Sequence, residues 1–322
     1  MRTHRMMTRP EAAQFLRTHD NYIILTHRRP DGDTTGSAAA LCRALRAIGK
    51  TASVLENPQF TARLRPFVAD LTCQTAPEDA VIVSVDIATP ELLCFGAEAP
   101  GARLDLVIDH HGRNNLPCEN RLVERDRAAC GEIIYDLLCE LGAPIDRKTA
   151  EALYVAISTD TGCFKYSNVT AATLRTAAAL IDCGADVAPI NKTFFDTKSL
   201  SRLRLEARLS ESAELYAGGL VGLCILPQRW IDELSITEDD IDSISGFARA
   251  IEGVEIGITI REVEGGMGKI SLRTSPRFDA CALCRQLGGG GHSAAAGASV
   301  EGGIPAAKAA ILDVLKKSGL EL

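Results

Sequence analysis

The sequence predicts an α/β protein: a parallel-sheet domain with helices on both faces, a helical linker, and a smaller C-terminal α/β domain. In the first half of the chain, short apolar runs alternate with segments of helical periodicity, which is typical of a parallel sheet covered by helices. After Gly218-Gly219 the pattern changes to longer strand candidates separated by single helices. The length of 322 residues also favours roughly two domains.

The first half supplies the elements of the parallel sheet. Each strand candidate is a short apolar run, and each helix candidate repeats its apolar residues every three or four positions. Gly49 and Gly184 supply stop signals after two of the helices. In chain order, the expected strands are 22–26, 51–55, 80–85 and 104–108, and the expected helices are 36–48, 131–141, 148–158 and 170–183.

The second half begins with a charged helix, 199–215, which we expect to connect the domains because it carries many charged side chains. The expected domain limits are therefore 1–195, a linker at 196–212, and 213–322. Within the second domain, the expected strands are 220–226, 254–263 and 269–274, and the expected helices are 238–251, 279–287 and 305–317.

Composition excludes some classes of protein. A net charge of −7 argues against binding long nucleic acid, which needs a broad basic face, but leaves room for a small phosphorylated substrate. No apolar run approaches the ~18 residues that span a bilayer. No apolar signal segment follows the basic N-terminus, so we expect a cytoplasmic protein without a membrane partner. The eleven cysteines are scattered through apolar stretches, as reduced core residues are.

Acidic and histidine residues gather directly after the apolar runs. Asp109-His110-His111 follows the run 104–108, and Asp86 follows the run 80–85. Open parallel sheets bind ligands beyond the carboxyl ends of their strands. A single Asp-x-Asp pair is usually a turn or a helix cap, and a single His-His pair is a weak signal. Four motifs together, at 27–33, 85–86, 109–111 and 159–162, indicate a site. The candidate residues are His27, Asp31, Asp33, Asp86, Asp109, His110, His111 and Asp160.

These residue types favour two divalent metal ions. Four carboxylates in one pocket repel each other and raise each other's pKa values unless cations are present. We expect Asp31 and Asp33 in an extended segment, where residues two apart face the same side. Oxygen ligands with a minority of imidazoles suit manganese or magnesium better than structural zinc. Two ions ~3.5–4 Å apart clamp the attacking and leaving oxygens at phosphorus, and a hydroxide between them is a nucleophile near neutral pH.

Taken together, these motifs resemble the DHH phosphoesterase superfamily, which includes the RecJ exonucleases and the family II pyrophosphatases. The resemblance rests on the Asp-His-His triplet, on His27-x-x-x-Asp31-x-Asp33, on Val85-Asp86 and on Asp160-Thr161-Gly162. Ile270-Ser271-Leu272-Arg273, the glycines 288–291 before His292, and Ala295-Ala296-Gly297 resemble its DHH-associated C-terminal domain. The length is similar to that of the nano-RNase and pAp-phosphatase (RecJ-like) branch.

The resemblance implies a role for each candidate. One ion would be held by His27, Asp31 and Asp86, and the other by Asp33, Asp86, His110 and Asp160, so that Asp86 bridges them. Asp109 would orient His110, and His111 would face the scissile phosphate as a phosphate contact or a proton donor. The ions would be Mn²⁺, with Mg²⁺ or Co²⁺ as alternatives. Ser167 and Asn168 are weaker candidates.

A second set of residues is expected to bind the far phosphate of a short substrate. Glycines expose backbone N–H groups and let phosphate approach closely, and an arginine grips phosphate through two parallel hydrogen bonds. By analogy with the family, this clamp would consist of Arg273, Gly289, Gly290, Gly291 and His292 in the substrate-binding domain, facing the metals.

The resemblance implies a manganese-dependent phosphodiesterase and phosphatase. It also implies that the protein forms a homodimer. The enzyme would hydrolyse short oligoribonucleotides (nano-RNA, pApA, pGpG) to nucleoside 5′-monophosphates, and also pAp to AMP. A cyclic di-AMP phosphodiesterase is the main alternative. An inorganic pyrophosphatase is disfavoured by the second domain, and a non-catalytic nucleotide sensor is disfavoured because all six expected ligands are present.

Overall fold

The computed structural model describes residues 5–94, 104–241, 244–263 and 265–321. The chain divides into two compact units, 1–197 and 198–322. The helix expected as a linker, α8 (Leu200–Glu211), belongs to the second unit. Its Leu205 and Leu209 are fully buried in a core that includes Cys224 and Leu226. None of the helices in the described part of the chain combines the length and the apolar character needed to cross a bilayer.

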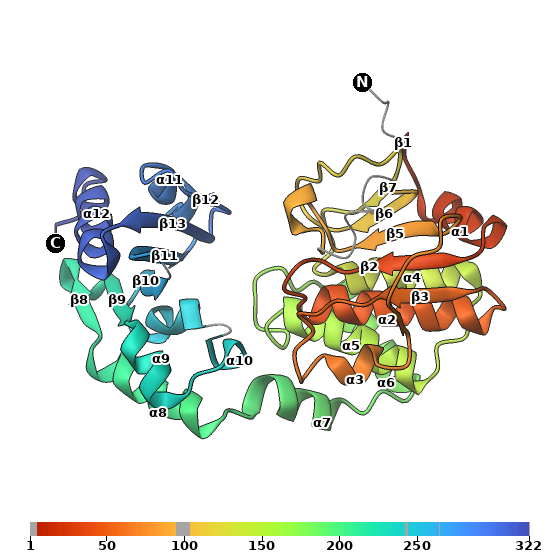
Figure 1. Ribbon diagram of the computed structural model, residues 1–322, viewed down its shortest axis with the longest axis horizontal. Helices are drawn as coiled ribbons and strands as arrows, with labels where there is room; N and C mark the ends of the chain where they lie inside the picture. The colour runs from red at the N-terminus through yellow and green to blue at the C-terminus, as the bar shows by residue number, and fades with distance from the viewer. Residues whose placement is uncertain (1–4, 95–103, 242–243, 264, 322) are drawn as a thin grey trace. The chain divides into compact units, whose positions relative to one another are not determined.

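The first unit is built on a seven-stranded sheet in which every pairing is parallel (Figure 1). The four predicted strands are present, and three short ones were missed. Two of these have two residues each, and the third begins with Asn-Arg, so no apolar run marks them. The strands are β1 (Arg5–Met6), β2 (Tyr22–Leu25), β3 (Ala52–Leu55), β4 (Thr72–Cys73), β5 (Val81–Val85), β6 (Leu106–Asp109) and β7 (Asn120–Val123).

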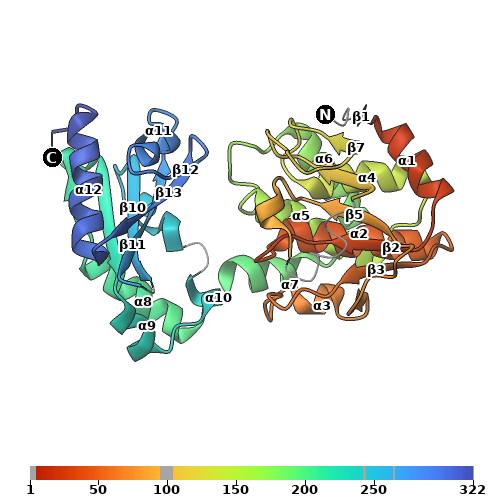
Figure 2. The same cartoon turned by 45° about the horizontal axis from the view of Figure 1, so that its top comes forward.

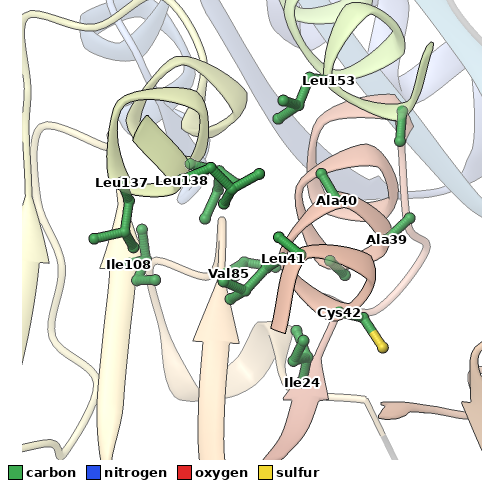
Figure 3. Close-up of a cluster of buried hydrophobic side chains, with 14 of the residues drawn as sticks. Ile24, Ala39, Ala40, Leu41, Cys42, Val85, Ile108, Leu137, Leu138 and Leu153 are labelled. Carbon is green, nitrogen blue, oxygen red and sulfur yellow. The ribbon is translucent and has the colours of Figure 1, made fainter. Parts of the chain in front are cut away.

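Helices cover one face of this sheet. Their apolar side chains pack against alternate strand residues such as Ile24, Val85 and Ile108, as Figure 3 shows for α2, α4 and α5. The opposite strand residues, such as Ile23 and Val107, pack in the described part of the chain against connecting segments. The helices are α1 (Arg9–Thr18), α2 (Gly32–Ala47), α3 (Arg65–Val68), α4 (Cys130–Leu141), α5 (Arg147–Asp160), α6 (Ala171–Asp182) and α7 (Val187–Asn191), with the short turns η1 (Pro90–Leu92) and η4 (Lys192–Asp196).

The strand order is β1-β7-β6-β5-β2-β3-β4. From β2 the chain adds β3 and β4 on one side, and then returns to add β5, β6 and β7 on the other. The order therefore reverses between β2 and β5, which is where open α/β sheets bind ligands. His27, Asp86 and His110 follow the carboxyl ends of three neighbouring strands, β2, β5 and β6.

The second unit is a six-stranded mixed sheet in the order β12-β13-β11-β10-β9-β8. One face packs on α11 and α12, and the other on α8 and η6 (Figure 2). The predicted fold class, a parallel-sheet domain followed by a smaller α/β domain, is therefore confirmed. The helices expected on both faces of the first sheet instead lie on one face among the described residues, because connecting segments cover the other. The strands are β8 (Glu214–Tyr216), β9 (Val221–Leu226), β10 (Ile256–Val263), β11 (Met267–Thr274), β12 (Gly290–Gly291) and β13 (Ala295–Glu301); the helices are α9 (Gln228–Leu234), α10 (Glu238–Ile241), α11 (Ala280–Arg285) and α12 (Gly303–Lys317), with the 3-10 turns η5 (Ala217–Gly219) and η6 (Ile244–Ala250).

Two expected helices differ in this unit. The helix expected at 199–215 ends at Glu211, and the chain continues as the edge strand β8. The helix expected at 238–251 is a short α10 followed by the 3-10 turn η6, while residues 242–243 lie outside the described residues. Gly246 lies inside this segment and lowers its helix propensity.

Candidate metal centre

Helix α2 begins four residues earlier than predicted, so the expected extended segment around Asp31 and Asp33 is wrong. Asp31 is the N-cap, and its carboxylate accepts hydrogen bonds from the amides of Asp33 and Thr34 at 3.0 and 3.1 Å. Asp33 lies in the first turn and is fully buried, whereas Asp31 is exposed. Aspartate is among the best N-cap residues because it satisfies free amides at a helix start. The Pro30-Asp31 pair was the signal that could have placed this start.

Two glycines let α2 and α5 approach each other closely. A Cβ atom on Gly32 would lie 2.3 Å from Thr159 Oγ1, and one on Gly36 would lie 2.2 Å from the carbonyl oxygen of Ala152. Both contacts are far below normal van der Waals separations. The close approach brings Asp160, the last residue of α5, to the start of α2.

We expect Gly36→Ala to destabilise the protein by about 1–3 kcal/mol, since the new methyl group would overlap backbone rather than a movable side chain. Alanine otherwise favours a helix interior by about 1 kcal/mol over glycine, so a loss runs against the intrinsic preference. Chemical denaturation measures it. Gly246→Ala is the control, because a Cβ there meets nothing within 4 Å. Equal stability of both variants would contradict the tight contact.

The N-terminus of α4 holds the Asp33 carboxylate. The amides of Cys130 and Gly131 donate to its two oxygens at 2.7 and 2.9 Å, and Ser37 Oγ donates at 3.1 Å. Helix N-termini favour negative charge, since their first amides have no partner within the helix. Asp33 is therefore fixed by two helices, its own and α4.

Asp86 combines burial, backbone strain and an unsatisfied oxygen. Its φ is +59°, in the left-handed region that aspartate tolerates better than most residues. The residue is 3% exposed, and its Oδ1 has no hydrogen-bond partner among the described residues. Nitrogens of His110 and His111 lie 3.4 and 3.5 Å from this oxygen. A buried carboxylate oxygen without a partner is costly, and strain of this kind is concentrated at functional sites.

Two histidines present the same ring nitrogen to the acidic cluster. His27 Nδ1 lies 2.9 Å from the carbonyl oxygen of Arg28, and His110 Nδ1 lies 3.2 Å from that of Arg127. Because a carbonyl only accepts, each Nδ1 carries the proton and each Nε2 faces the carboxylates. His27 Nε2 lies 3.4 Å from Asp31 and 3.7 Å from Asp86; His110 Nε2 lies 3.4 Å from Asp86, 3.6 Å from Asp160 and 3.7 Å from Asp33.

The expected pairing of Asp109 with His110 is wrong. The carboxylate of Asp109 accepts from His111 Nδ1 at 2.7 Å, whereas the Nδ1 of His110 is bound to the Arg127 carbonyl. The other Asp109 oxygen accepts from Asn114 Nδ2 at 2.7 Å. Asp109 is fully buried, while His111 is partly exposed. Asp109 thus orients the histidine that faces outward.

These side chains form three groups, and within each group the ligand atoms lie within 4.8 Å of one another. The first matches one predicted ligand set, the second contains the other predicted set without the expected bridge Asp86, and the third adds His111, which the sequence did not suggest as a ligand. Asp86 belongs to two of the groups. The groups are His27, Asp31 and Asp86; Asp33, His110 and Asp160; and Asp86, His110 and His111.

The pKa values of the buried groups in this site are those of a site suited to cations. Burial and the neighbouring Asp160 raise the pKa of the Asp33 carboxyl to about 7. Burial and the charges of Asp33 and Asp31 raise the pKa of Asp86 well above its usual value. Burial opposes charge on His27, but Asp31 and Asp86 outweigh it and raise the pKa to about 9. Divalent cations would relieve this repulsion and satisfy Asp86 Oδ1, so the donor set fits a pair of them.

In the second unit, the register of the sheet brings two of the predicted clamp residues together. Arg273 on β11 lies opposite Ala295 on β13, and the His292 amide donates to the Ala295 carbonyl at 2.7 Å. The His292 side chain is exposed. Gly289 does not have the expected free amide, because it donates to the Cys284 carbonyl at 2.9 Å.

The glycines of this loop have a packing role. A Cβ on Gly289 would lie 2.1 Å from the Gly297 carbonyl oxygen, and one on Gly291 would lie 2.5 Å from that of Ala295. Gly290 and Gly291 form β12, which pairs with β13. The glycine run therefore allows a close strand pairing that fixes the position of His292.

Comparisons with known proteins match both units of the chain. Residues 21–157 match the DHH family, N-terminal domain, and residues 223–318 match the DHHA1 domain. The chain is 32% identical over 281 residues to a Thermus thermophilus protein named bifunctional oligoribonuclease and PAP phosphatase NrnA, covering 87% of this chain and 84% of that protein. A Bacillus subtilis protein of the same name is 26% identical over 90% of this chain and 92% of its own.

A solved structure shares the fold. The exopolyphosphatase-related protein from Bacteroides fragilis superimposes with a TM-score of 0.87 at 24% identity, covering 96% of each chain. With the two domain matches and the 32% identical relative, the conclusion is direct: the chain belongs to the DHH family of phosphoesterases, carries a DHHA1 domain in its second unit, and is a hydrolase of phosphoester bonds.

Proposed function

We propose that the protein is a manganese-dependent phosphodiesterase that hydrolyses short oligoribonucleotides to nucleoside 5′-monophosphates, and a phosphatase that converts pAp to AMP. The observation that carries this proposal is the set of three ligand groups linked through Asp86 and His110, at the point where the strand order reverses. The relatives named bifunctional oligoribonuclease and PAP phosphatase support the substrate class. A homodimer and a cytoplasmic location belong to the same proposal.

The two ions would be held by His27, Asp31 and Asp86 and by Asp33, His110 and Asp160. Asp86 would also contribute to the second ion, since its Oδ1 lies 3.4 Å from His110 Nε2. When bound, such ions polarise a phosphoryl oxygen and lower the pKa of bound water. His27 and His110 are kept ready for this role because backbone carbonyls hold their Nδ1 protons and leave Nε2 free.

Asp109 and His111 would serve the leaving oxygen. Asp109 accepts the Nδ1 proton of His111, which fixes the imidazole ring and leaves its Nε2 to hold or donate a proton. Asn114 anchors Asp109 in turn, since its amide group also donates to the Ile87 carbonyl at 2.9 Å. The hydrogen bonds from Asn114 to Asp109 and from His111 to Asp109 therefore anchor the proton donor His111 to a buried carboxylate.

In the second unit, Arg273 and His292 would contact a substrate phosphate other than the one that reacts. We expect His292→Ala to raise KM for pApA about 10-fold to 100-fold with little change in kcat, because a hydrogen bond to a charged group contributes about 1.5–3 kcal/mol. Steady-state kinetics measure this. His19→Ala, which removes an exposed histidine stacked on Phe15, is the control and should leave both constants unchanged. An unchanged KM in His292→Ala would remove His292 from the clamp.

A comparison of kcat/KM tests the function as a whole. The purified protein with manganese is given pApA, pGpG, a 5′-phosphorylated 24-mer, pAp, cyclic di-AMP and pyrophosphate. We expect the dinucleotides and pAp to be preferred. Preference for cyclic di-AMP would replace the proposed substrate, cleavage of pyrophosphate alone would overturn the role of the second unit, and no cleavage at all would favour a nucleotide sensor.

A further inference from the structure

The turn that joins β7 to α4, residues 124–129, and the first two residues of α4 contact the second ligand group through their backbone. The Arg127 carbonyl accepts the Nδ1 proton of His110 at 3.2 Å, and the Cys130 and Gly131 amides hold Asp33 at 2.7 and 2.9 Å. These contacts come from main-chain atoms, so no side-chain motif in the sequence signals them.

The same turn also reaches the third member of this group. Asn168 Nδ2 donates to the Ala128 carbonyl at 3.1 Å and to the Asp160 carbonyl at 3.1 Å. Asn168 thereby ties the end of α5 to the turn. The turn and the first two residues of α4 therefore hold the Asp33 carboxylate and the His110 ring directly. Through Asn168 the turn also holds the main chain of Asp160.

A closed ring of ion pairs holds the turn in place. Arg127 binds Glu124 at 3.1 Å and Asp136 at 2.5 Å, and Arg9 binds the same two carboxylates at 2.6 and 2.8 Å. The Arg127 side chain is 15% exposed, and it also lies 3.4 Å from the buried Glu132. Charges partly removed from water interact more strongly than surface pairs, so a ring of this kind is a firm anchor.

We propose that Arg127 is a positioning residue for the metal centre, acting on the Asp33, His110 and Asp160 group through the backbone of its own turn. The inference rests on the proposed function, because it assumes that this group binds an ion. Loss of the guanidinium would free the turn, so that the Arg127 carbonyl would no longer hold the His110 Nδ1 proton in place. Outer partners of metal-bound histidines typically change metal affinity about 10-fold to 100-fold when altered.

Calorimetric titration of the full-length, chelator-treated protein with Mn²⁺ tests this without any substrate. We expect Arg127→Met to weaken binding of one of two ions by about 10-fold to 100-fold and to leave the other within a few-fold. Arg127→Lys, which keeps the charge but cannot reach three carboxylates at once, should restore part of the loss. Arg43→Met is the matched control, since Arg43 is also 15% exposed and pairs with Asp70 at 2.7 Å, and its guanidinium is bound at Asp70 and the Phe67 carbonyl rather than at the ligand groups.

The outcomes separate the two ideas. If Arg127→Met binds both ions as tightly as Arg43→Met does, the positioning role is refuted while the proposed function stands. If the unmodified protein binds no manganese, the proposed function fails, and the inference fails with it. Should Arg127→Met not fold, as judged by circular dichroism, the Arg127→Lys titration decides: affinity equal to that of the unmodified protein overturns the inference, and a selective loss for one ion supports it.

Discussion

Replacing Asp86 with asparagine is expected to lower kcat for short oligoribonucleotides by more than about 100-fold, beyond the range typical of residues that only support a metal ligand. Asp86 belongs to two of the three ligand groups, and its Oδ1 has no hydrogen-bond partner among the described residues. An amide has the same shape but supplies no negative charge to hold two cations. Turnover of pApA at saturating manganese is the measurement.

The same variant is expected to be more stable than the unmodified protein when metal is absent. The pKa of Asp86 is raised by burial and by Asp33 and Asp31, so its ionised form is a burden on the metal-free fold. Asparagine removes that charge, and thermal melting in chelator at pH 8 should show a higher Tm. Asp105→Asn is the control, since Asp105 directly precedes β6. It therefore lies at the amino ends of the strands, whereas the candidate metal centre lies at their carboxyl ends. Near-normal turnover by Asp86→Asn would contradict the shared-ligand assignment.

Removal of metal is expected to make stability strongly dependent on pH. Asp33 has a pKa of about 7 in the fold against 3.8 for an ordinary aspartate, so above pH 4 the unfolded chain loses a proton that the folded chain keeps. The free energy of unfolding of the metal-free protein therefore falls as pH rises from about 4 to about 7. The fold stabilises the charged form of His27, whose pKa is raised to about 9. This contribution to the free energy of unfolding is lost as pH rises from about 6.5 to about 9. Both groups act in the same direction, on the order of several kcal/mol together.

Thermal melting with and without manganese at pH 5.5 and 8.5 measures this effect. Without metal, Tm should be lower at pH 8.5. Manganese should raise Tm at both values but more at pH 8.5, because at pH 5.5 protons compete for the same carboxylates and imidazoles. Asp86→Asn, lacking the shared ligand, should gain much less from manganese. An equal gain in Tm at the two pH values would count against the assignment of Asp33 and His27 to the metal site.

The residues that gather at the candidate metal centre could be predicted from the sequence, because metal chemistry favours a few side-chain types and parallel sheets place them at strand ends. Asp86 directly follows the run 80–85, and His110 comes two residues after the run 104–108, so their placement needed only the rule that ligands bind beyond the strand ends. The order of the strands could not be predicted in this way, since β1, β4 and β7 are too short or too polar to mark themselves. The ligand assignment itself remains a proposal.

The partners of these side chains were harder to predict. Asp109 was expected to serve His110 and in fact binds His111, because the backbone path after β6 decides which ring meets the buried carboxylate. The proposed role of Arg127 was not predicted, because the atom that meets His110 is its main-chain carbonyl, which every residue type carries. The helix start at Gly32 could have been predicted, since Asp31 is a strong N-cap residue. Sequence patterns thus indicate which groups do the chemistry but seldom what holds them.

The ligands that α2, α5 and the strand ends bring together are spread from His27 to Asp160 along the chain. Each of the three ligand groups combines residues from distant parts of the chain. Loops of tens of residues must therefore close before either proposed ion could bind. The proposed affinity for manganese would thereby be restricted to molecules whose first unit has folded completely. Metal uptake during refolding would consequently report the last tertiary step rather than an early one, and a cell short of manganese would accumulate the least stable form of this protein.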